Sequence, residues 1–293
     1  MFCINQRSIK KEILIKGIGL HSGQPVNLRL IPAKSNEGIN FVKEGKVIPA
    51  VIDYATGFEF STTLSKGNVK ISTIEHLMSA LFFTGIDNIY IEIDAEEVPI
   101  LDGSAIKFVE KIKKAGIEIL GEEKMYAVLS KEVVVYENGK FIKGKPSNTF
   151  TATYHAQYNN RIIGNRKYTY SNLKADFENV AKARTYCFLE EVEMLQKMGL
   201  AKGGSLDNAV VFEGDSVLNP EGLRFDDEPV KHKVLDLIGD LYLLGYPLIG
   251  DVYSYKGGHK LNAAFVRKII DEKAFDIKCS SQIGIRNFGR LVA

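Results

Sequence analysis

The feature that most constrains the fold is an order of elements that occurs twice. In each half, a helical pattern bearing a histidine leads to a strand-like run, then to a glycine, then to a second helical pattern. These positions are His76, 88–93 and Gly103 in the first half, and His232, 248–254 and Gly258 in the second. The spacing from histidine to glycine is 27 residues in the first half and 26 in the second. Such self-similarity predicts duplicated α+β units packed face to face, with a cleft between them.

Local patterns place further elements around this repeat. Short runs with β-branched residues and Gly or Pro punctuation predict strands before residue 72. Asn138-Gly139 between two alternating runs predicts a β-hairpin. The segment 116–126 is typical of a connector, 188–198 of a short amphipathic helix, and 228–244 of a longer helix. A division into an N-terminal domain, 1–120, and a C-terminal domain, 121–293, follows.

Composition excludes several classes of protein. The 293 residues carry 38 Lys+Arg against 36 Asp+Glu, so we expect no general nucleic-acid binder, which would have a basic excess. The three cysteines, Cys3, Cys187 and Cys279, are scattered and predict neither a disulfide framework nor a cysteine metal site. The N-terminus lacks a signal-peptide run, and the apolar stretch 235–249 is too short and too charged to span a bilayer. We therefore expect a cytoplasmic protein without stable membrane insertion.

The most informative stretch is 231–240. His232, Asp236 and Asp240 are spaced by four residues, so a helix places them on one face. An imidazole and a carboxylate at this spacing can bind one cation, and such N/O ligation suits Zn²⁺ or Fe²⁺. The same spacing fits an ion pair on a helix surface equally well. His76 would be a third ligand, leaving the open position of a catalytic zinc site.

Glu75, next to His76, has two interpretations. It could be the general base for a metal-activated water. Alternatively, Ser72-x-x-Glu75 is a capping-box pattern that would make Glu75 a helix N-terminus residue, and the motif alone favours this interpretation.

His259 and two glycine clusters also invite functional interpretations. His259 follows Gly257-Gly258 and could be a general acid kept protonated by Asp240, or an ordinary helix-start residue. The cluster 17–23 has the glycines of a dinucleotide fingerprint, but a strand-like run follows where a helix is required, so that interpretation fails. The cluster 202–205 lacks Walker spacing, and tight turns explain both clusters best.

Together these motifs resemble one family, the UDP-3-O-acyl-N-acetylglucosamine deacetylases, zinc enzymes of lipid A synthesis in Gram-negative bacteria. The resemblance covers nearly the whole chain in order. The matching segments are GIGLHSG (17–23), ISTIEHLMSAL (71–81), VPILDGSA (98–105), KARTYCF (182–188), GLAKGGSLDNAVV (199–211), NPEGLRFDDEPVKHKVLDLIGDL (219–241) and YKGGHKLN (255–262).

The resemblance implies an α+β fold of two similar domains, each a helix pair packed on a β-sheet, with the active site between them. It implies a hydrolase that removes the N-acetyl group from UDP-3-O-(3-hydroxyacyl)-N-acetylglucosamine, releasing acetate. The implied roles are zinc ligands for His76, His232 and Asp236, general base for Glu75, general acid for His259 paired with Asp240, oxyanion stabilisation for Thr185, and substrate binding with charge stabilisation for Lys233.

The resemblance also implies an insert at about 186–212 that forms an apolar passage for the fatty acyl chain. Phe188, Val192 and Leu195 on the helix 188–198 fit that passage, although ordinary core packing explains the same stripe. Gly204 and His21 are further expected substrate-binding residues, His21 near the nucleotide. The expected partner is the UDP-sugar lipid alone, bound by a monomer.

Overall fold

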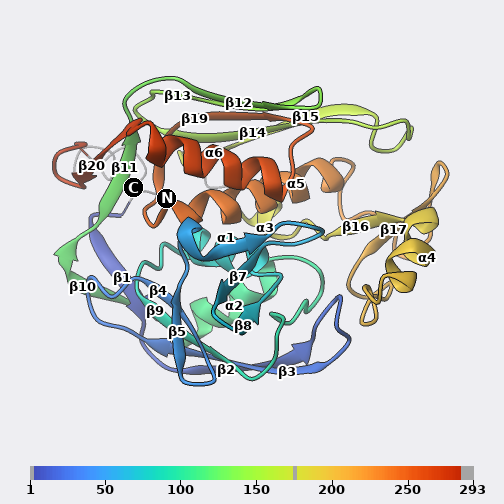
Figure 1. Ribbon diagram of the computed structural model, residues 1–293, viewed down its shortest axis with the longest axis horizontal. Coiled ribbons are helices and arrows are strands. Elements are labelled where there is room, and N and C mark those ends of the chain that lie inside the picture. The colour runs from blue at the N-terminus through green and yellow to red at the C-terminus, as the bar shows by residue number, and fades with distance from the viewer. Residues whose placement is uncertain (1–2, 174–176, 285–293) are drawn as a thin grey trace.

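The computed structural model describes residues 3–173 and 177–284, and its elements form two large sheets with helices between them (Figure 1). The first half supplies a five-stranded sheet in the order β2-β3-β9-β4-β5. Its strands are β2 (Ile13–Ile18), β3 (Pro25–Pro32), β4 (Ile39–Lys43), β5 (Lys46–Pro49) and β9 (Ile89–Ile93). Helices α1 (Glu75–Thr84) and α2 (Ile106–Ala115) come from the same half.

The second half supplies a seven-stranded sheet. Its main path runs β12-β13-β19-β11-β20, and β14 pairs with both β19 and β15. The strands are β11 (Met125–Leu129), β12 (Val133–Glu137), β13 (Lys140–Lys145), β14 (Phe150–Gln157), β15 (Asn165–Ser171), β19 (Leu248–Tyr255) and β20 (Phe275–Cys279). Helices α5 (Glu228–Leu241) and α6 (His259–Asp271) belong to this half.

Smaller elements complete the described chain. β1 (Asn5–Ile9) pairs with β10 (Ile117–Glu123), and two three-stranded sheets are formed by β6-β7-β8 and β16-β17-β18. Their strands are β6 (Ala55–Gly57), β7 (Thr63–Lys66), β8 (Val69–Ile71), β16 (Tyr186–Phe188), β17 (Val210–Glu213) and β18 (Ser216–Val217). The remaining helices are α3 (Phe177–Ala181), α4 (Leu189–Lys197) and the 3₁₀ turns Ile52–Tyr54 and Tyr242–Leu244.

The four long helices form the inside of a layered molecule. In Figure 1, α5 and α6 lie beneath the seven-stranded sheet, and α1 and α2 lie above the five-stranded sheet. Contacts join α6 to β12, α5 to β14, α1 to α5, and α1 to α2. One apolar core therefore runs from one sheet through the helices to the other.

Nearly every residue of helices α1 and α5 is buried, and the two helices meet closely at a glycine. A Cβ on Gly239 of α5 would lie 2.2 Å from the carbonyl oxygen of Glu75 and 2.9 Å from Ser79 Oγ. Ser79 Oγ also donates a hydrogen bond of 2.5 Å to the carbonyl of Leu235. This close approach brings polar side chains of α1 and α5 together inside the molecule. Buried charges are costly unless they are paired or bound to a ligand.

Several sequence predictions are confirmed. The chain is α+β, Asn138-Gly139 forms the turn between β12 and β13, and α4 lies within the predicted helix 188–198. The connector predicted at 116–126 is wrong, since most of it forms β10 and the start of β11. Its alternation is weak because β10 pairs with a single strand and is largely exposed.

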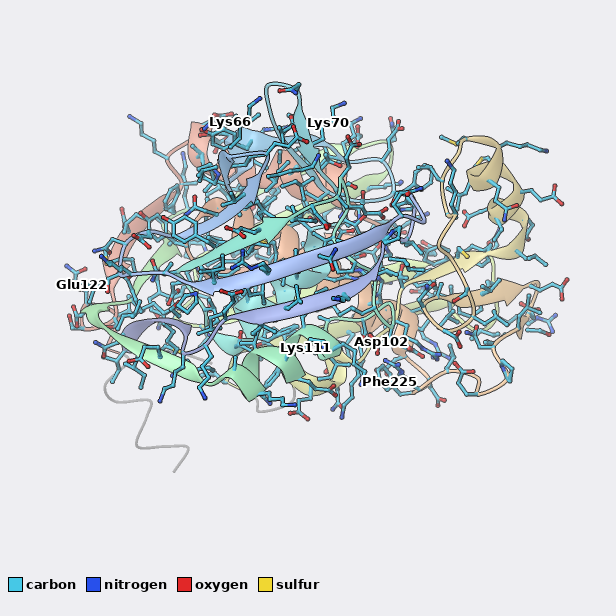
Figure 2. All side chains as sticks on the ribbon, turned by 90° about the horizontal axis from the view of Figure 1, so that it is seen from below. Lys66, Lys70, Asp102, Lys111, Glu122 and Phe225 are labelled. Atoms are coloured by element: carbon cyan, nitrogen blue, oxygen red, sulfur yellow. The ribbon has the colours of Figure 1, made fainter. Side chains whose placement is uncertain are left out.

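The two halves also meet outside the helix layers. Figure 2 shows Asp102 of the first half beside Phe225 of the second, where Arg224 Nη2 lies 3.0 Å from Asp102 Oδ2. Helix α4 and strands β16 and β17 project from the body at one end of the molecule in Figure 1. Within the described residues, no helix combines the length and apolar character needed to cross a bilayer.

Candidate metal centre

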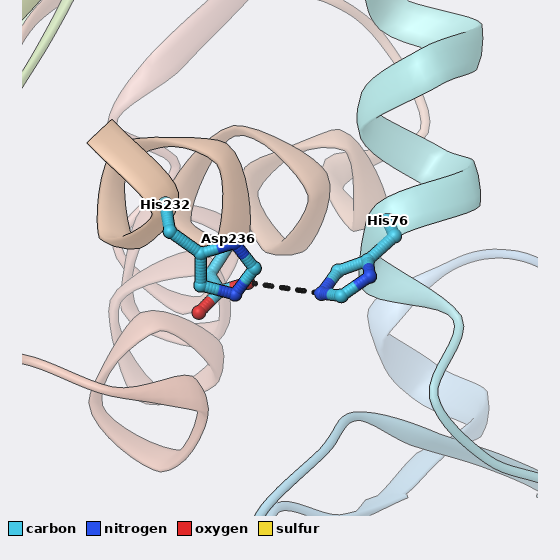
Figure 3. Close-up of side chains that lie close together, drawn as sticks. All are labelled: His76, His232 and Asp236. Carbon is cyan, nitrogen blue, oxygen red and sulfur yellow. Dashed lines mark ion pairs between the residues drawn. The ribbon is translucent and has the colours of Figure 1, made fainter. Parts of the chain in front are cut away.

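Three buried side chains from two helices converge on one point. His76 comes from the start of α1, while His232 and Asp236 lie one turn apart on α5 (Figure 3). Asp236 Oδ1 is 3.3 Å from His232 Nε2 and 3.6 Å from His76 Nε2. The three potential ligand atoms all lie within 4.8 Å of one another. The structure thus brings the three predicted ligands together.

The hydrogen bonds of this cluster leave its inner atoms available for a cation. His232 Nδ1 lies 3.0 Å from the carbonyl of Ala183, so the ring donates there and keeps its lone pair on Nε2. Asp236 Oδ1 is buried without a hydrogen-bond partner. A buried acceptor facing two imidazoles is costly unless a ligand occupies the space, and two His nitrogens with one carboxylate oxygen suit a divalent metal.

The charges of the cluster favour the ligand forms. Burial lowers the pKa of His232 to about 3, so its imidazole is neutral at physiological pH. Burial alone would raise the pKa of Asp236, but neighbouring groups that include the Lys233 ammonium outweigh burial and hold this pKa well below its usual range. Lys233 Nζ donates a 2.8 Å hydrogen bond to Asp236 Oδ2. Lys233 therefore fixes the outer oxygen of Asp236 while the inner one stays unpaired.

Glu75 is the first residue of α1, and its carboxylate points into the site. Glu75 Oε2 accepts a 3.0 Å hydrogen bond from the backbone N–H of Thr62. The capping-box interpretation is wrong, because the N-cap is Ile74 and Ser72 Oγ instead donates to the carbonyl of Glu96. Burial raises the pKa of Glu75 against the opposing effects of His259 and His76. A carboxylate with a raised pKa beside this candidate metal site is suited to accept a proton.

His259 faces Glu75 from the start of α6. Its Nδ1 donates to Asp240 Oδ2 at 2.8 Å, and its Nε2 lies 3.9 Å from Glu75 Oε1. Burial alone would lower the pKa of His259, but the charges of Asp240 and Glu75 outweigh it and raise the pKa to about 10. His259 is therefore protonated at neutral pH and holds a proton toward the cluster.

Two residues that the sequence did not single out hold Asp240 in place. Thr62 Oγ1 donates to Asp240 Oδ1 at 2.6 Å, and Asn262 Nδ2 donates to Asp240 Oδ2 at 2.9 Å. Asn262 lies three residues after His259 on α6, a spacing that could have revealed it. No sequence pattern marks Thr62, because its loop reaches the site only in the folded chain.

The loop before β16 carries Thr185 beside the site. Arg184 is buried and paired with Glu228 at the start of α5, with Arg184 Nε 2.8 Å from Glu228 Oε1. This pair secures Ala183, which accepts the His232 hydrogen bond, and the adjoining Thr185. The backbone N–H of Thr185 donates to the carbonyl of Gly103 at 2.8 Å. The loop that bears the predicted oxyanion residue is thus anchored to both halves.

An aromatic row leads from the projecting segment to the cluster. The ring of Phe188 lies 5.9 Å from Tyr158, Tyr158 lies 6.3 Å from Tyr186, and Tyr186 lies 6.3 Å from His232. Val192 is half-buried and Leu195 is buried on α4. Tyr158 and Tyr186 were missed because they lie far apart in the sequence.

The other two predicted substrate residues lie in two loops that touch each other. The backbone N–H of Lys202 donates to the carbonyl of His21 at 3.2 Å, and that of Gly203 donates to Leu20 at 3.0 Å. Gly204 is exposed, whereas His21 is half-buried with its ring 6.4 Å from Phe60. Phe60 lies two residues before Thr62, so this loop pair borders the site.

A buried His-His-Asp cluster beside a carboxylate and a charged histidine, within an α+β frame, defines a class of metal-dependent enzymes. A family profile described as UDP-3-O-acyl N-acetylglycosamine deacetylase matches residues 6–271. The chain belongs to this family of deacetylases.

The sequence of this chain aligns with those of curated relatives over most of their length. A UDP-3-O-acyl-N-acetylglucosamine deacetylase of Campylobacter fetus subsp. fetus is 44% identical over 278 residues, 94% of this chain and 95% of the relative. Proteins of the same name from Anaeromyxobacter dehalogenans and Aquifex aeolicus are 42% and 41% identical, covering 92% and 90% of this chain and 89% and 92% of the relatives.

Proposed function

We propose that this chain hydrolyses the N-acetyl group of UDP-3-O-(3-hydroxyacyl)-N-acetylglucosamine, giving acetate and the free 2-amine, the committed step of lipid A biosynthesis. One observation carries the proposal. A carboxylate with a raised pKa and a protonated histidine, Glu75 and His259, face each other beside a cluster suited to a metal, in a chain of the deacetylase family. Amide hydrolysis requires such a general base, general acid and metal site.

The proposed metal is Zn²⁺, held by His76, His232 and Asp236. Two neutral imidazoles and one carboxylate are the donors of a catalytic zinc site, and Fe²⁺ accepts the same set, so iron can replace zinc in the cell. When bound, such a metal polarises a carbonyl and lowers the pKa of water to about 7.

The residues around the cluster divide the proton transfers between them. Glu75 takes a proton from the water that attacks the acetamide carbonyl carbon. As the C–N bond breaks, His259 Nε2 gives its proton to the leaving nitrogen, and Asp240 stabilises the charged ring beforehand through its hydrogen bond to Nδ1. One water is consumed, and acetate and the amine are released.

Two further residues are proposed to stabilise charge that develops on the substrate during the reaction. Thr185 is assigned to stabilise the developing oxyanion through its hydroxyl, because its loop also carries the carbonyl that orients His232. Lys233 is assigned to bind substrate and stabilise charge, because its ammonium lies beside Asp236 and 5.5 Å from the Tyr186 ring.

The fatty acyl chain is proposed to lie along Phe188, Val192 and Leu195, in the insert at about 186–212. The aromatic row from Phe188 to His232 supports an apolar passage that ends at the site. His21 is assigned to the nucleotide end and Gly204 to the neighbouring loop.

The two halves are proposed to be duplicated domains, 1–120 and 121–293, with the active site between them. The strand orders β2-β3-β9-β4-β5 and β12-β13-β19-β14-β15 support this, because corresponding pairs of neighbouring strands have the same relative direction in both sheets. In both, the central strand pairs antiparallel on one side and parallel on the other. We further propose that the protein acts as a cytoplasmic monomer in a Gram-negative bacterium.

Acetate release from UDP-3-O-acyl-N-acetylglucosamine tests the function, measured with bound zinc for the wild type and Glu75→Ala. We expect about one zinc in both proteins, as a three-ligand site requires. Turnover of the variant should fall by ~10²–10⁴-fold, the usual contribution of a positioned base. Exposed Glu122→Ala is the matched control and should retain full activity. Metal binding without acetate release by the wild type would indicate another amide substrate, and full activity of Glu75→Ala would refute the base assignment.

A further inference from the structure

Glu97 is a buried carboxylate that the mechanism above does not use. It is 2% exposed and accepts three hydrogen bonds from two separate segments. The backbone N–H groups of His21 and Ser22 donate to it at 2.9 and 2.8 Å, and Thr73 Oγ1 donates at 3.0 Å. Since a buried carboxylate is costly unless its oxygens are satisfied, this convergence fixes both segments relative to each other.

The segment that contains Thr73 leads directly into helix α1, which carries Glu75 and His76. Thr73 lies two residues before Glu75 and has a φ of 57°. A β-branched residue rarely adopts the left-handed region, and such a conformation persists only where its surroundings hold it. The hydroxyl bond to Glu97 is one such restraint, and it lies where the chain turns to place Glu75 and His76 in the site.

The second segment is the glycine cluster 17–23, for which the sequence alone predicts a tight turn. A Cβ on Gly19 would lie 2.3 Å from Glu97 Oε2, so the glycine lets the loop close over the carboxylate. The cluster at 202–205 packs on the other side, where a Cβ on Gly203 would lie 2.2 Å from the carbonyl of Gly19. The glycines of both clusters therefore serve contacts between loops.

These contacts form a continuous connection. Glu97 holds the start of α1 and the loop 19–23, and that loop is hydrogen-bonded to Lys202 and Gly203. Residues 199–204 in turn follow α4, the helix assigned to the acyl passage. We propose that Glu97 is a positioning residue that sets the acyl passage in register with the catalytic carboxylate of Glu75. This inference rests on the proposed function.

The variant Glu97→Gln keeps the size of the side chain but replaces one acceptor oxygen with an NH₂ group, so either the His21 or the Ser22 backbone N–H loses its acceptor. Misplacement of reacting groups by about 1 Å can cost ~10²-fold in rate, so we expect kcat/KM to fall by 10–100-fold while bound zinc stays at the wild-type level. Asp87→Asn is the matched control. Asp87 is also a largely buried carboxylate that accepts a backbone N–H, from Arg7 at 3.0 Å, and it additionally pairs with Lys124 Nζ at 2.6 Å, so its variant controls for a general loss of stability at a position beyond the opposite end of α1.

A second pair of variants isolates the connection to α1. Thr73→Val removes the hydroxyl and keeps the branched shape, while Thr73→Ser keeps the hydroxyl. We expect Thr73→Val to lower kcat about tenfold with little change in KM, and Thr73→Ser to retain most of the wild-type kcat. If Glu97→Gln does not fold, this pair decides the outcome, and equal activities of the two variants would overturn the proposal.

Hydrogen exchange of the metal-free proteins gives a readout independent of catalysis. Amides 20–23 and 72–75 should exchange faster in Glu97→Gln than in the wild type, and at the wild-type rate in Asp87→Asn. Unchanged exchange, or a loss of kcat/KM no larger than that of Asp87→Asn, would overturn the proposal. If the wild type releases no acetate but Glu97→Gln still exchanges faster than the wild type at these amides, the proposed substrate is refuted and the positioning role of Glu97 is still supported.

Discussion

At the scale of single residues, Asp240 controls the charge of His259. Asp240 holds the ring through Nδ1 and is the largest of the influences that raise the pKa of His259 to about 10 against burial. It is itself held by Thr62 and Asn262, so its position does not depend on the substrate. The assigned acid is therefore charged before the reaction begins.

The variant Asp240→Asn tests this control through pH dependence. The carboxylate raises the pKa of His259, so its removal lowers that pKa and the ring loses its proton at a lower pH. We expect the alkaline limb of the kcat/KM profile to move to lower pH, with reduced activity at neutral pH. The measurement is kcat/KM across the alkaline range for variant and wild type. An alkaline limb that stays in place would show that His259 does not supply the proton.

At the scale of elements, the crossing of α1 and α5 assembles the ligand set. His76 and Glu75 come from one helix, while His232, Asp236 and Asp240 come from the other. Gly239 permits the approach, since any Cβ there would meet the backbone of Glu75. The ligand spacing on α5 is visible in the sequence, but the crossing is not, because a glycine inside a helix gives no indication of which helix it will contact.

Gly239→Ala should separate the two helices at the site. Overpacking a tight contact costs about 1–3 kcal/mol, and the displacement moves His76 away from the ligands on α5. We expect a lower melting temperature and weaker zinc binding, measured by calorimetry and by competition with a chelator. Gly121→Ala is the matched control, because a Cβ there meets nothing within 4 Å. Zinc affinity equal to wild type in Gly239→Ala would contradict the role of the crossing.

At the scale of the whole molecule, the sequence predicted the local elements better than their partners. The repeat around His76 and His232 predicted the helices and central strands, because hydrophobic period is a local property. It could not reveal that 117–123 pairs with β1, nor that Thr62 and Glu97 meet residues distant in the chain. Those contacts depend on chain reversal and loop packing, and only the folded molecule defines them.

The metal should link the two halves thermodynamically. Its proposed ligands come from α1 in the first half and α5 in the second, so a metal that binds only the folded state stabilises both together. At a free zinc concentration of 100 times Kd, this stabilisation is about 2.7 kcal/mol. Removal of zinc with a chelator should therefore lower the melting temperature of the wild type, and added zinc should restore it.

Asp236→Ala separates this linkage from catalysis. The variant lacks the carboxylate that both imidazoles face, so its zinc occupancy should fall and its melting temperature should respond little to zinc. Glu75→Ala keeps all three proposed ligands and should show the full response despite its low turnover. Calorimetric melting with and without zinc compares the three proteins. Full zinc retention by Asp236→Ala would mean that the ligand set is wrong, because two imidazoles are one short of the three protein ligands of a catalytic zinc site.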